Sequence, residues 1–128
     1  MILFDHNIPR DQIEQLRRWR VRGEQIGYDV GRPEWQDQEE VLRELHRRKH
    51  VTFFTRDIGF LRSAFRHADS CIVVLTGNVV DTAVIVRRFL RHPTLRAKAA
   101  RMGCVIKLTS ESISVQRLGH SRQERLSW

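Results

Sequence analysis

A short apolar run that ends in charged residues constrains the fold of this chain more than any other stretch. Residues 51–55 read VTFFT, and Arg56 and Asp57 follow at once. Such a β-branched and aromatic segment predicts a buried parallel strand, and open α/β sheets place their sites where such strands end. Residues 2–4 run in the same way into Asp5. Two strands that each deliver an aspartate to one sheet edge predict a shared acidic pocket.

Strand-like and helix-like segments alternate along most of the chain. Asn7 is a candidate cap for the first helix, and Pro9 suits its first turn. The alternation predicts a three-layer α/β fold with a mostly parallel central sheet, closed by a C-terminal β-hairpin. The predicted strands are residues 1–5, 28–30, 51–55, 70–76, 105–108 and 113–118, and the predicted helical segments are 9–21, 37–50, 58–65, 79–90 and 95–102.

Length and composition predict one domain. The chain has 128 residues, which suffices for one core, and we assign residues 1–118 to the domain and residues 119–128 to a polar tail. We find neither the run of about 20 apolar residues that a membrane helix needs nor an export signal, so we expect a cytoplasmic protein without membrane partners. Cys71 and Cys104 lie in apolar runs, where free cysteine behaves as a small hydrophobe.

The charge of the chain indicates a class of partner. Lys and Arg number 23 against 15 Asp and Glu, a net charge of +8, and most of the cations are arginine. Arginine forks onto phosphates and stacks on bases, which favours nucleic acid as the partner. Solubility and an acidic protein partner are alternatives that charge alone leaves open.

Three aspartates form the candidate site. Asp5 and Asp57 end predicted strands, and Asp37 begins the helix that leads to the second strand. Clustered carboxylates can hold Mg²⁺ or Mn²⁺, which activates water and neutralises charge on a phosphodiester. Other roles stay open, because Asp5 and Asp37 can cap helices and Asp57 can pair with Arg56.

Three segments together resemble the PIN-like nuclease family, in its shortened, toxin-like (VapC-like) branch. Residues 3–9, LFDHNIP, are similar to a strand followed by the branch's DENLP motif. Residues 54–60, FTRDIGF, are similar to TRDxDF, and residues 37–42, DQEEVL, to the acidic helix start DEEIL. The likeness covers roughly residues 1–118.

The resemblance implies a PIN-like fold, a divalent-metal ribonuclease and the toxin of a toxin-antitoxin pair. Asp5, Asp37 and Asp57 are then the catalytic and metal-binding residues. RNA is the expected substrate, and an antitoxin protein and a homodimer are open as further partners. Three arginines are the expected RNA contacts, namely Arg56, Arg10 and Arg62, and the secondary site candidates are Glu39, Glu40, Asn7 and Thr55. For Thr55 we favour a role as a β-branched strand residue over one in the site.

Three positions depart from the pattern of the branch. His6 replaces a glutamate, Gly59 replaces the second aspartate of TRDxDF, and Gln38 falls where the helix acid belongs when residues 41–42 are aligned. A shift by one residue brings Asp37 or Glu39 there instead. The alternative function is therefore that of a degenerate PIN-like protein, which binds RNA or an acidic protein partner without cleavage.

Overall fold

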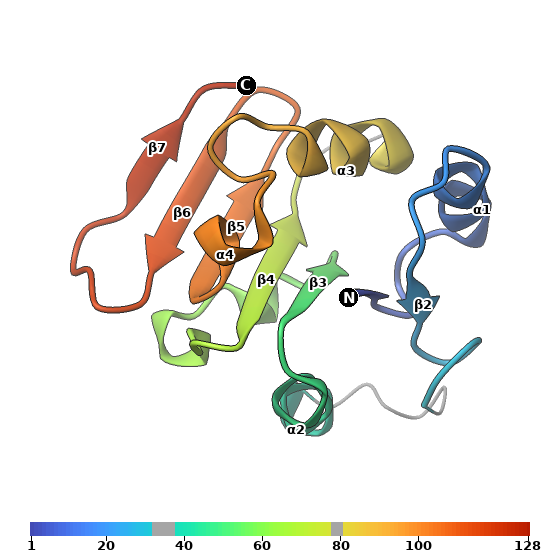
Figure 1. Ribbon diagram of the computed structural model, residues 1–128, viewed down its shortest axis with the longest axis horizontal. Helices are drawn as coiled ribbons and strands as arrows, with labels where there is room; N and C mark the ends of the chain where they lie inside the picture. The colour runs from blue at the N-terminus through green and yellow to red at the C-terminus, as the bar shows by residue number, and fades with distance from the viewer. Residues whose placement is uncertain (32–37, 78–80) are drawn as a thin grey trace.

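One mixed sheet organises the chain (Figure 1). The computed structural model describes residues 1–31, 38–77 and 81–128, and within these ranges seven strands pair in the order β2-β1-β3-β4-β5-β6-β7. Strands β1 to β5 pair in parallel, whereas β6 and β7 are antiparallel. This confirms the predicted α/β class and the mostly parallel sheet. The strands are β1 (Ile2–Phe4), β2 (Glu24–Gln25), β3 (Val51–Thr55), β4 (Ser70–Leu75), β5 (Cys104–Leu108), β6 (Ile113–Arg117) and β7 (Glu124–Leu126).

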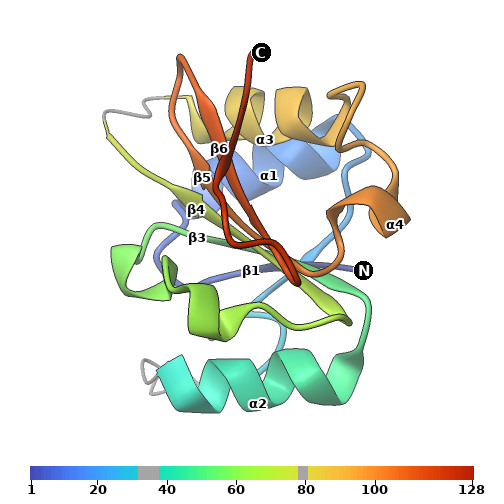
Figure 2. The ribbon, with the colours of Figure 1, turned by 90° about the vertical axis from the view of Figure 1, so that its left-hand side faces the viewer.

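Helices cover both faces of the sheet, which gives three layers (Figure 2). One face carries α1 and α3, and the other carries α2 with two short 3₁₀ turns, η1 and η2. The bounds of these elements are α1 (Arg10–Arg18), α2 (Gln38–Arg48), η1 (Ile58–Phe60), η2 (Ser63–Phe65), α3 (Thr82–Leu90) and α4 (Lys98–Arg101).

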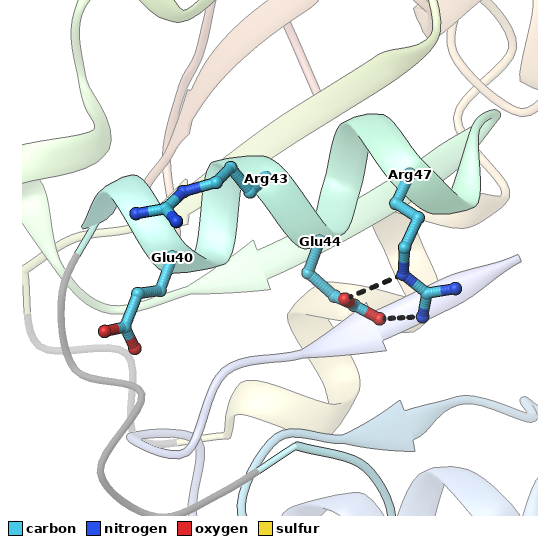
Figure 3. A pocket seen from close by; sticks show the side chains of 4 residues that line it. All are labelled: Glu40, Arg43, Glu44 and Arg47. Atoms are coloured by element: carbon cyan, nitrogen blue, oxygen red, sulfur yellow. Dashed lines mark hydrogen bonds and ion pairs between the residues drawn. The ribbon is translucent and has the colours of Figure 1, made fainter.

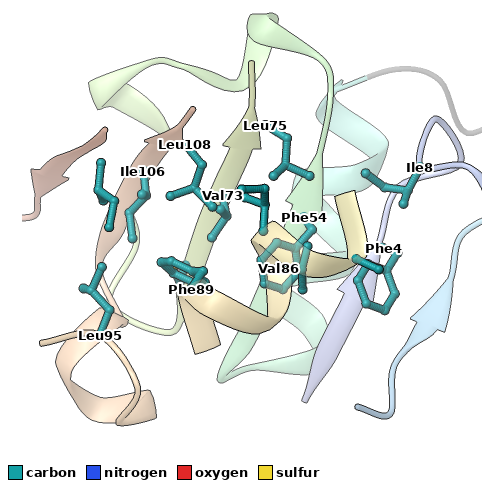
Figure 4. Close-up of a cluster of buried hydrophobic side chains, with 14 of the residues drawn as sticks. Phe4, Ile8, Phe54, Val73, Leu75, Val86, Phe89, Leu95, Ile106 and Leu108 are labelled. Carbon is teal, nitrogen blue, oxygen red and sulfur yellow. The ribbon is translucent and has the colours of Figure 1, made fainter. Parts of the chain in front are cut away.

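Alternating side chains of the central strands feed two separate cores. In β3, Phe54 packs in the cluster under α1 and α3, whereas Phe53 packs in the cluster over α2. Phe54 stacks on Phe4 of β1 and meets Phe89 of α3 edge-on (Figure 4). Because both faces are covered, every residue of β3 and β4 is buried, and most of them are apolar, as in buried parallel strands.

Several predicted elements differ from the observed ones. The second strand is Glu24–Gln25, not residues 28–30, which contribute a single bridge from Val30 to Ile26. Pro9 is the N-cap of α1 without a side-chain bond, so Asn7 is not its cap. Residues 58–65 form two 3₁₀ turns instead of one helix.

The stretch that we assigned to a polar tail contributes a strand. Residues Glu124–Leu126 form β7, which pairs with β6. The indole of Trp128 then donates a 3.0 Å hydrogen bond to the carbonyl of Thr109, while Arg88 of α3 lies over the Trp128 ring. The far edge of the sheet is therefore extended by the last residues of the sequence.

The burial of the two cysteines agrees with the sequence prediction. Cys71 and Cys104 are free thiols in the core, and burial raises the pKa of both. They pack as small hydrophobes, as the sequence predicts.

Among the described residues, no helix combines the length and the apolar character that crossing a membrane requires.

Candidate functional site

The candidate site lies where the strand order of the sheet reverses. The chain leaves β1 for β2 on one side and returns through α2 to β3 on the other side, so β1 lies between them. In doubly wound sheets ligands bind outside the carboxyl ends of the strands at such a switch point. Here those ends carry Asp5, directly after β1, and Asp57, two residues after β3.

The hydroxyl of Thr55 joins the two strand ends. Phe4 is in register with Phe54, which places Asp5 beside Thr55. Thr55 Oγ1 donates a 2.7 Å hydrogen bond to Asp5 Oδ2 and accepts one of 3.0 Å from the backbone N–H of Asp57. Thr55 is fully buried and Asp5 is 2% exposed. Thr55 is therefore more than the β-branched strand residue that we favoured from the sequence.

The second carboxylate oxygen of Asp5 contacts His6. Asp5 Oδ1 accepts a 2.8 Å hydrogen bond from the backbone N–H of His6 and lies 2.8 Å from His6 Nδ1. Because a carboxylate only accepts, the ring contact requires a proton on Nδ1. His6, which departs from the glutamate of the related motif, thus supplies donors to Asp5 in place of a further acid.

Asn7 ties the β1 end to the β3 end. Its Nδ2 lies 3.4 Å from both Asp5 Oδ2 and Thr55 Oγ1, and its Oδ1 accepts a 3.1 Å hydrogen bond from the backbone N–H of Arg56. The Asn7 amide therefore spans the two loops that carry the aspartates. This differs from the helix cap that we considered for Asn7 from the sequence.

Asp57 meets the beginning of α2. Its Oδ1 accepts a 2.9 Å hydrogen bond from the backbone N–H of Gly59 and caps η1, while its Oδ2 lies 3.4 Å from Gln38 Nε2. A Cβ atom built on Gly59 would lie 1.9 Å from Gln38 Nε2. The amide of Gln38 thus occupies the space in which a side chain at position 59 would begin. Two departures from the related motif are therefore neighbours in the structure.

The other predicted acids lie in the first turn of α2 or outside the described residues. Asp37 belongs to residues 32–37, which the structure does not describe. Glu39 is exposed in the first turn of α2. Glu40 lines a hollow along α2 with Arg43, Glu44 and Arg47, where Glu44 pairs with Arg47 (Figure 3). Within the described ranges, no three His, Cys, Asp or Glu side chains gather as a metal-binding group.

The three predicted RNA-binding arginines have different surroundings. Arg56 is exposed between Thr55 and Asp57. Arg62 is exposed on the loop between η1 and η2, with its guanidinium carbon 5.7 Å from the centre of the Phe65 ring. Arg10 is half-buried and engaged in contacts of its own. Arg56 thus lies directly before Asp57 in the chain and is exposed there.

Arg10 belongs to a polar cluster that the sequence analysis missed. Its guanidinium donates a 3.0 Å hydrogen bond to Gln25 Oε1 and lies 4.7 Å from the centre of the Tyr28 ring. The amide of Gln25, fully buried in β2, donates to the backbone carbonyls of Asp5 and Ile8 at 3.1 and 2.8 Å. A glutamine in a strand as short as two residues carries no hydrophobic pattern, so no sequence signal pointed to it.

Asp29 closes the same cluster. Burial would raise its pKa, but the backbone N–H of Gln25 at 2.9 Å and the guanidinium of Arg17 at 2.6 Å lower the pKa below its usual value. Asp29 therefore stays ionised, and it is offset by Arg17 and by Arg10 at 3.6 Å. The loop after β2 is held by charge pairs as well as by backbone bonds.

Comparison of the chain with known proteins finds no match among family models, curated proteins or solved structures.

Proposed function

We propose that the chain is a PIN-like, divalent-metal-dependent ribonuclease of toxin-antitoxin type. The observation that supports this most is the junction of Asp5 and Asp57 through the Thr55 hydroxyl at the switch point of the sheet. Two acids from distant parts of the sequence are thereby held at one edge, in a chain with a net charge of +8. From the resemblance to the PIN-like family described in the sequence analysis, we also propose an antitoxin and a second copy of the chain as partners.

The acidic residues suit a hard divalent ion. Mg²⁺ binds proteins through one or two carboxylates and keeps its other positions for water and substrate phosphate. Asp5 and Asp57 are the two proposed ligands from the described residues, and Asp37 is the proposed third. When bound, such an ion lowers the pKa of its water and offsets charge on the phosphate. Mn²⁺ prefers the same oxygen ligands.

The protein groups around the acids fix their positions and attract the substrate. Thr55, His6 and Asn7 donate hydrogen bonds that hold the Asp5 carboxylate in one orientation. Arg56, exposed beside them, is the proposed contact to the phosphate that is cut, and the arginine-rich surface supplies the longer-range attraction.

Cleavage of single-stranded RNA tests this proposal. The purified chain should cut an unstructured RNA in Mg²⁺ or Mn²⁺ and not in EDTA. Asp5→Asn and Asp57→Asn should each abolish the cut, because each removes a carboxylate with little change of shape. Asp81→Asn, on an exposed acid at the start of α3, is the matched control. Cleavage that survives in both site variants would refute the ribonuclease.

A second function has an observation of its own. Gln38 presents an amide to Asp57 and fills the space over Gly59, so two positions of the related acidic motif hold neutral groups. Fewer carboxylates mean weaker cation binding. We therefore propose, as the alternative, an RNA-binding protein that does not cleave. It predicts binding that weakens with salt and no metal-dependent products.

A further inference from the structure

Two exposed apolar side chains flank the acidic centre. Among the large hydrophobic residues in the described ranges, Ile58 and Tyr28 are the most exposed, at 68% and 62%. Tyr28 follows β2 and Ile58 follows β3, while Asp5 follows β1 between them. Because the three strands are parallel neighbours, all three residues lie at the same edge of the sheet. A polar centre between two apolar flanks suits a ligand that has both characters.

The backbone that carries Tyr28 is held by several hydrogen bonds. The backbone N–H groups of Tyr28, Asp29 and Val30 all donate to the carbonyl of Gln25, at 3.2, 2.9 and 3.2 Å. Gly27 closes the turn by donating to the carbonyl of Val30 at 2.8 Å. A turn with this many internal bonds presents its side chain in a defined place, which reduces the entropy that a ligand must remove on binding.

Arg10 lies against the ring and leaves much of it to solvent. Its guanidinium carbon is 4.7 Å from the ring centre, the geometry of a cation–π contact. The guanidinium is fixed in turn by Gln25, whose amide also bonds the carbonyl of Asp5. Tyr28 and the acidic centre are therefore connected through Gln25, and an aromatic surface with a cation beneath it stands beside the site.

The local charge favours a nucleotide over other aromatic ligands. Arg10 and Arg17 outnumber the single acid Asp29 in this cluster, and Arg56 lies on the other side of Asp5. Bases of single-stranded RNA stack on exposed aromatic rings and on guanidinium planes, whereas the backbone follows positive charge.

We propose that Tyr28, backed by Arg10, is a stacking subsite for one base of a single-stranded RNA whose backbone passes the Asp5–Asp57 edge. This rests on the proposed function in that RNA is the ligand, but it does not depend on cleavage. Ile58 makes an apolar contact to the same RNA on the other side of the acidic centre. The subsite is tolerant of sequence, because every base offers a π-face.

Fluorescence anisotropy with a labelled single-stranded RNA of about 10 nucleotides, in EDTA to prevent cleavage, tests the subsite. Tyr28→Ala should weaken binding about 5- to 100-fold, and Tyr28→Trp should retain it, because stacking needs a ring and not the hydroxyl. The slope of log K against log salt should stay unchanged in Tyr28→Ala, since no phosphate contact is lost. In Arg56→Ala the slope should fall by about 0.7.

Leu118→Ala is the matched control, because Leu118 is 46% exposed at the opposite edge, where its backbone N–H bonds the carbonyl of Gly103 before β5. It should bind as the unaltered chain does. An RNA with abasic positions throughout should bind equally to the unaltered chain and to Tyr28→Ala. Equal binding of intact RNA by both proteins would overturn the subsite alone, while failure of the unaltered chain to bind RNA would overturn the subsite and the proposed function together.

Discussion

Thr55 Oγ1 donates a 2.7 Å hydrogen bond to Asp5 Oδ2 across the neighbouring strands β1 and β3, and both residues are buried. A carboxylate in such a place costs free energy unless donors compensate its lost hydration. The threonine hydroxyl, the backbone of His6 and the amide of Asn7 are those donors. The position of Asp5 is thus set by its neighbours on β3 as much as by β1.

Thr55→Val should therefore destabilise the fold by about 1–3 kcal/mol. The substitution keeps the shape and removes the hydroxyl, so Asp5 loses its shortest donor from another strand and the N–H of Asp57 loses its acceptor. Urea unfolding measures the change. Thr55→Ser, which keeps the hydroxyl and loses one methyl group, should cost about 1 kcal/mol or less. Equal losses in the two variants would show that the methyl group, and not the hydrogen bond, matters.

Gly59→Asp should make the stability of the chain respond more to Mn²⁺. Because a Cβ there would lie 1.9 Å from Gln38 Nε2, the flexible Gln38 amide must move, and a further carboxylate then stands beside Asp57. In EDTA the like charges should lower the melting temperature. At one fixed Mn²⁺ concentration the variant, which binds the ion more tightly, should gain more stability than the unaltered chain. At about ten times the Kd of the variant the gain is about 1.4 kcal/mol.

Gly59→Ala is the control for that experiment, since it displaces Gln38 without adding charge. Its melting temperature should respond to Mn²⁺ as that of the unaltered chain does. If Gly59→Asp and Gly59→Ala respond alike, the new carboxylate does not reach an ion.

Arg48→Ala should destabilise the chain more than Arg47→Ala, although both arginines bond Glu44. The Arg48 side chain is 16% exposed and also reaches Glu24, so it ties α2 to β2, whereas that of Arg47 is 69% exposed. Removal of Arg48 leaves Glu44 short of a partner in a largely buried place, at a cost of about 1–3 kcal/mol. Thermal unfolding of the two variants side by side measures the difference, and an equal or reversed order would contradict it.

Stability should fall as the pH drops below neutrality, in part through His46. Partial desolvation first, although the His46 side chain is exposed on one side, and then the stacked His67 ring at 4.1 Å between ring centres lowers the pKa of His46, while Asp69 opposes the shift. The unfolded chain thus takes up the proton more readily than the folded chain. The contribution of His46 is present above its unfolded pKa and is lost as the pH falls through its folded pKa.

Urea unfolding at about pH 7.5 and about pH 5.5 checks this for His46→Gln. The drop in free energy of unfolding between the two pH values should be smaller in the variant than in the unaltered chain. An unchanged drop would mean that His46 does not contribute to it.

The elements that sequence predicted well are those whose burial is complete. Residues 51–55 and 70–75 are mostly apolar because both sheet faces are covered. The hairpin of β5 and β6 is less completely buried, but its β-rich runs on either side of a polar turn also predicted it. The strand β2 was missed because it consists of Glu24 and Gln25, and the buried amide of Gln25 is satisfied by two carbonyls and a guanidinium that are distant in the sequence.

The same distinction applies to the site. Asp5 and Asp57 could be predicted as site residues because each follows an apolar strand, and this prediction needs no knowledge of contacts. The role of Thr55 depends on the register that aligns Phe4 with Phe54. The role of Gln38 depends on where α2 begins and on the packing of α2 against β3. Asp37 lies outside the described residues, so its predicted role stays a prediction.

The position of β1 inside the sheet also bears on the order of folding. Leu3 pairs with Glu24 on one side and with Phe53 on the other. The hydrogen bonds on both sides of β1 can therefore form only with segments that come much later in the sequence. Parallel pairing between distant segments is slow to form. During synthesis, residue 5 is made long before its partner at residue 55. The acidic centre therefore comes into being together with the middle of the sheet, and a folding intermediate without the β1–β3 ladder cannot contain it.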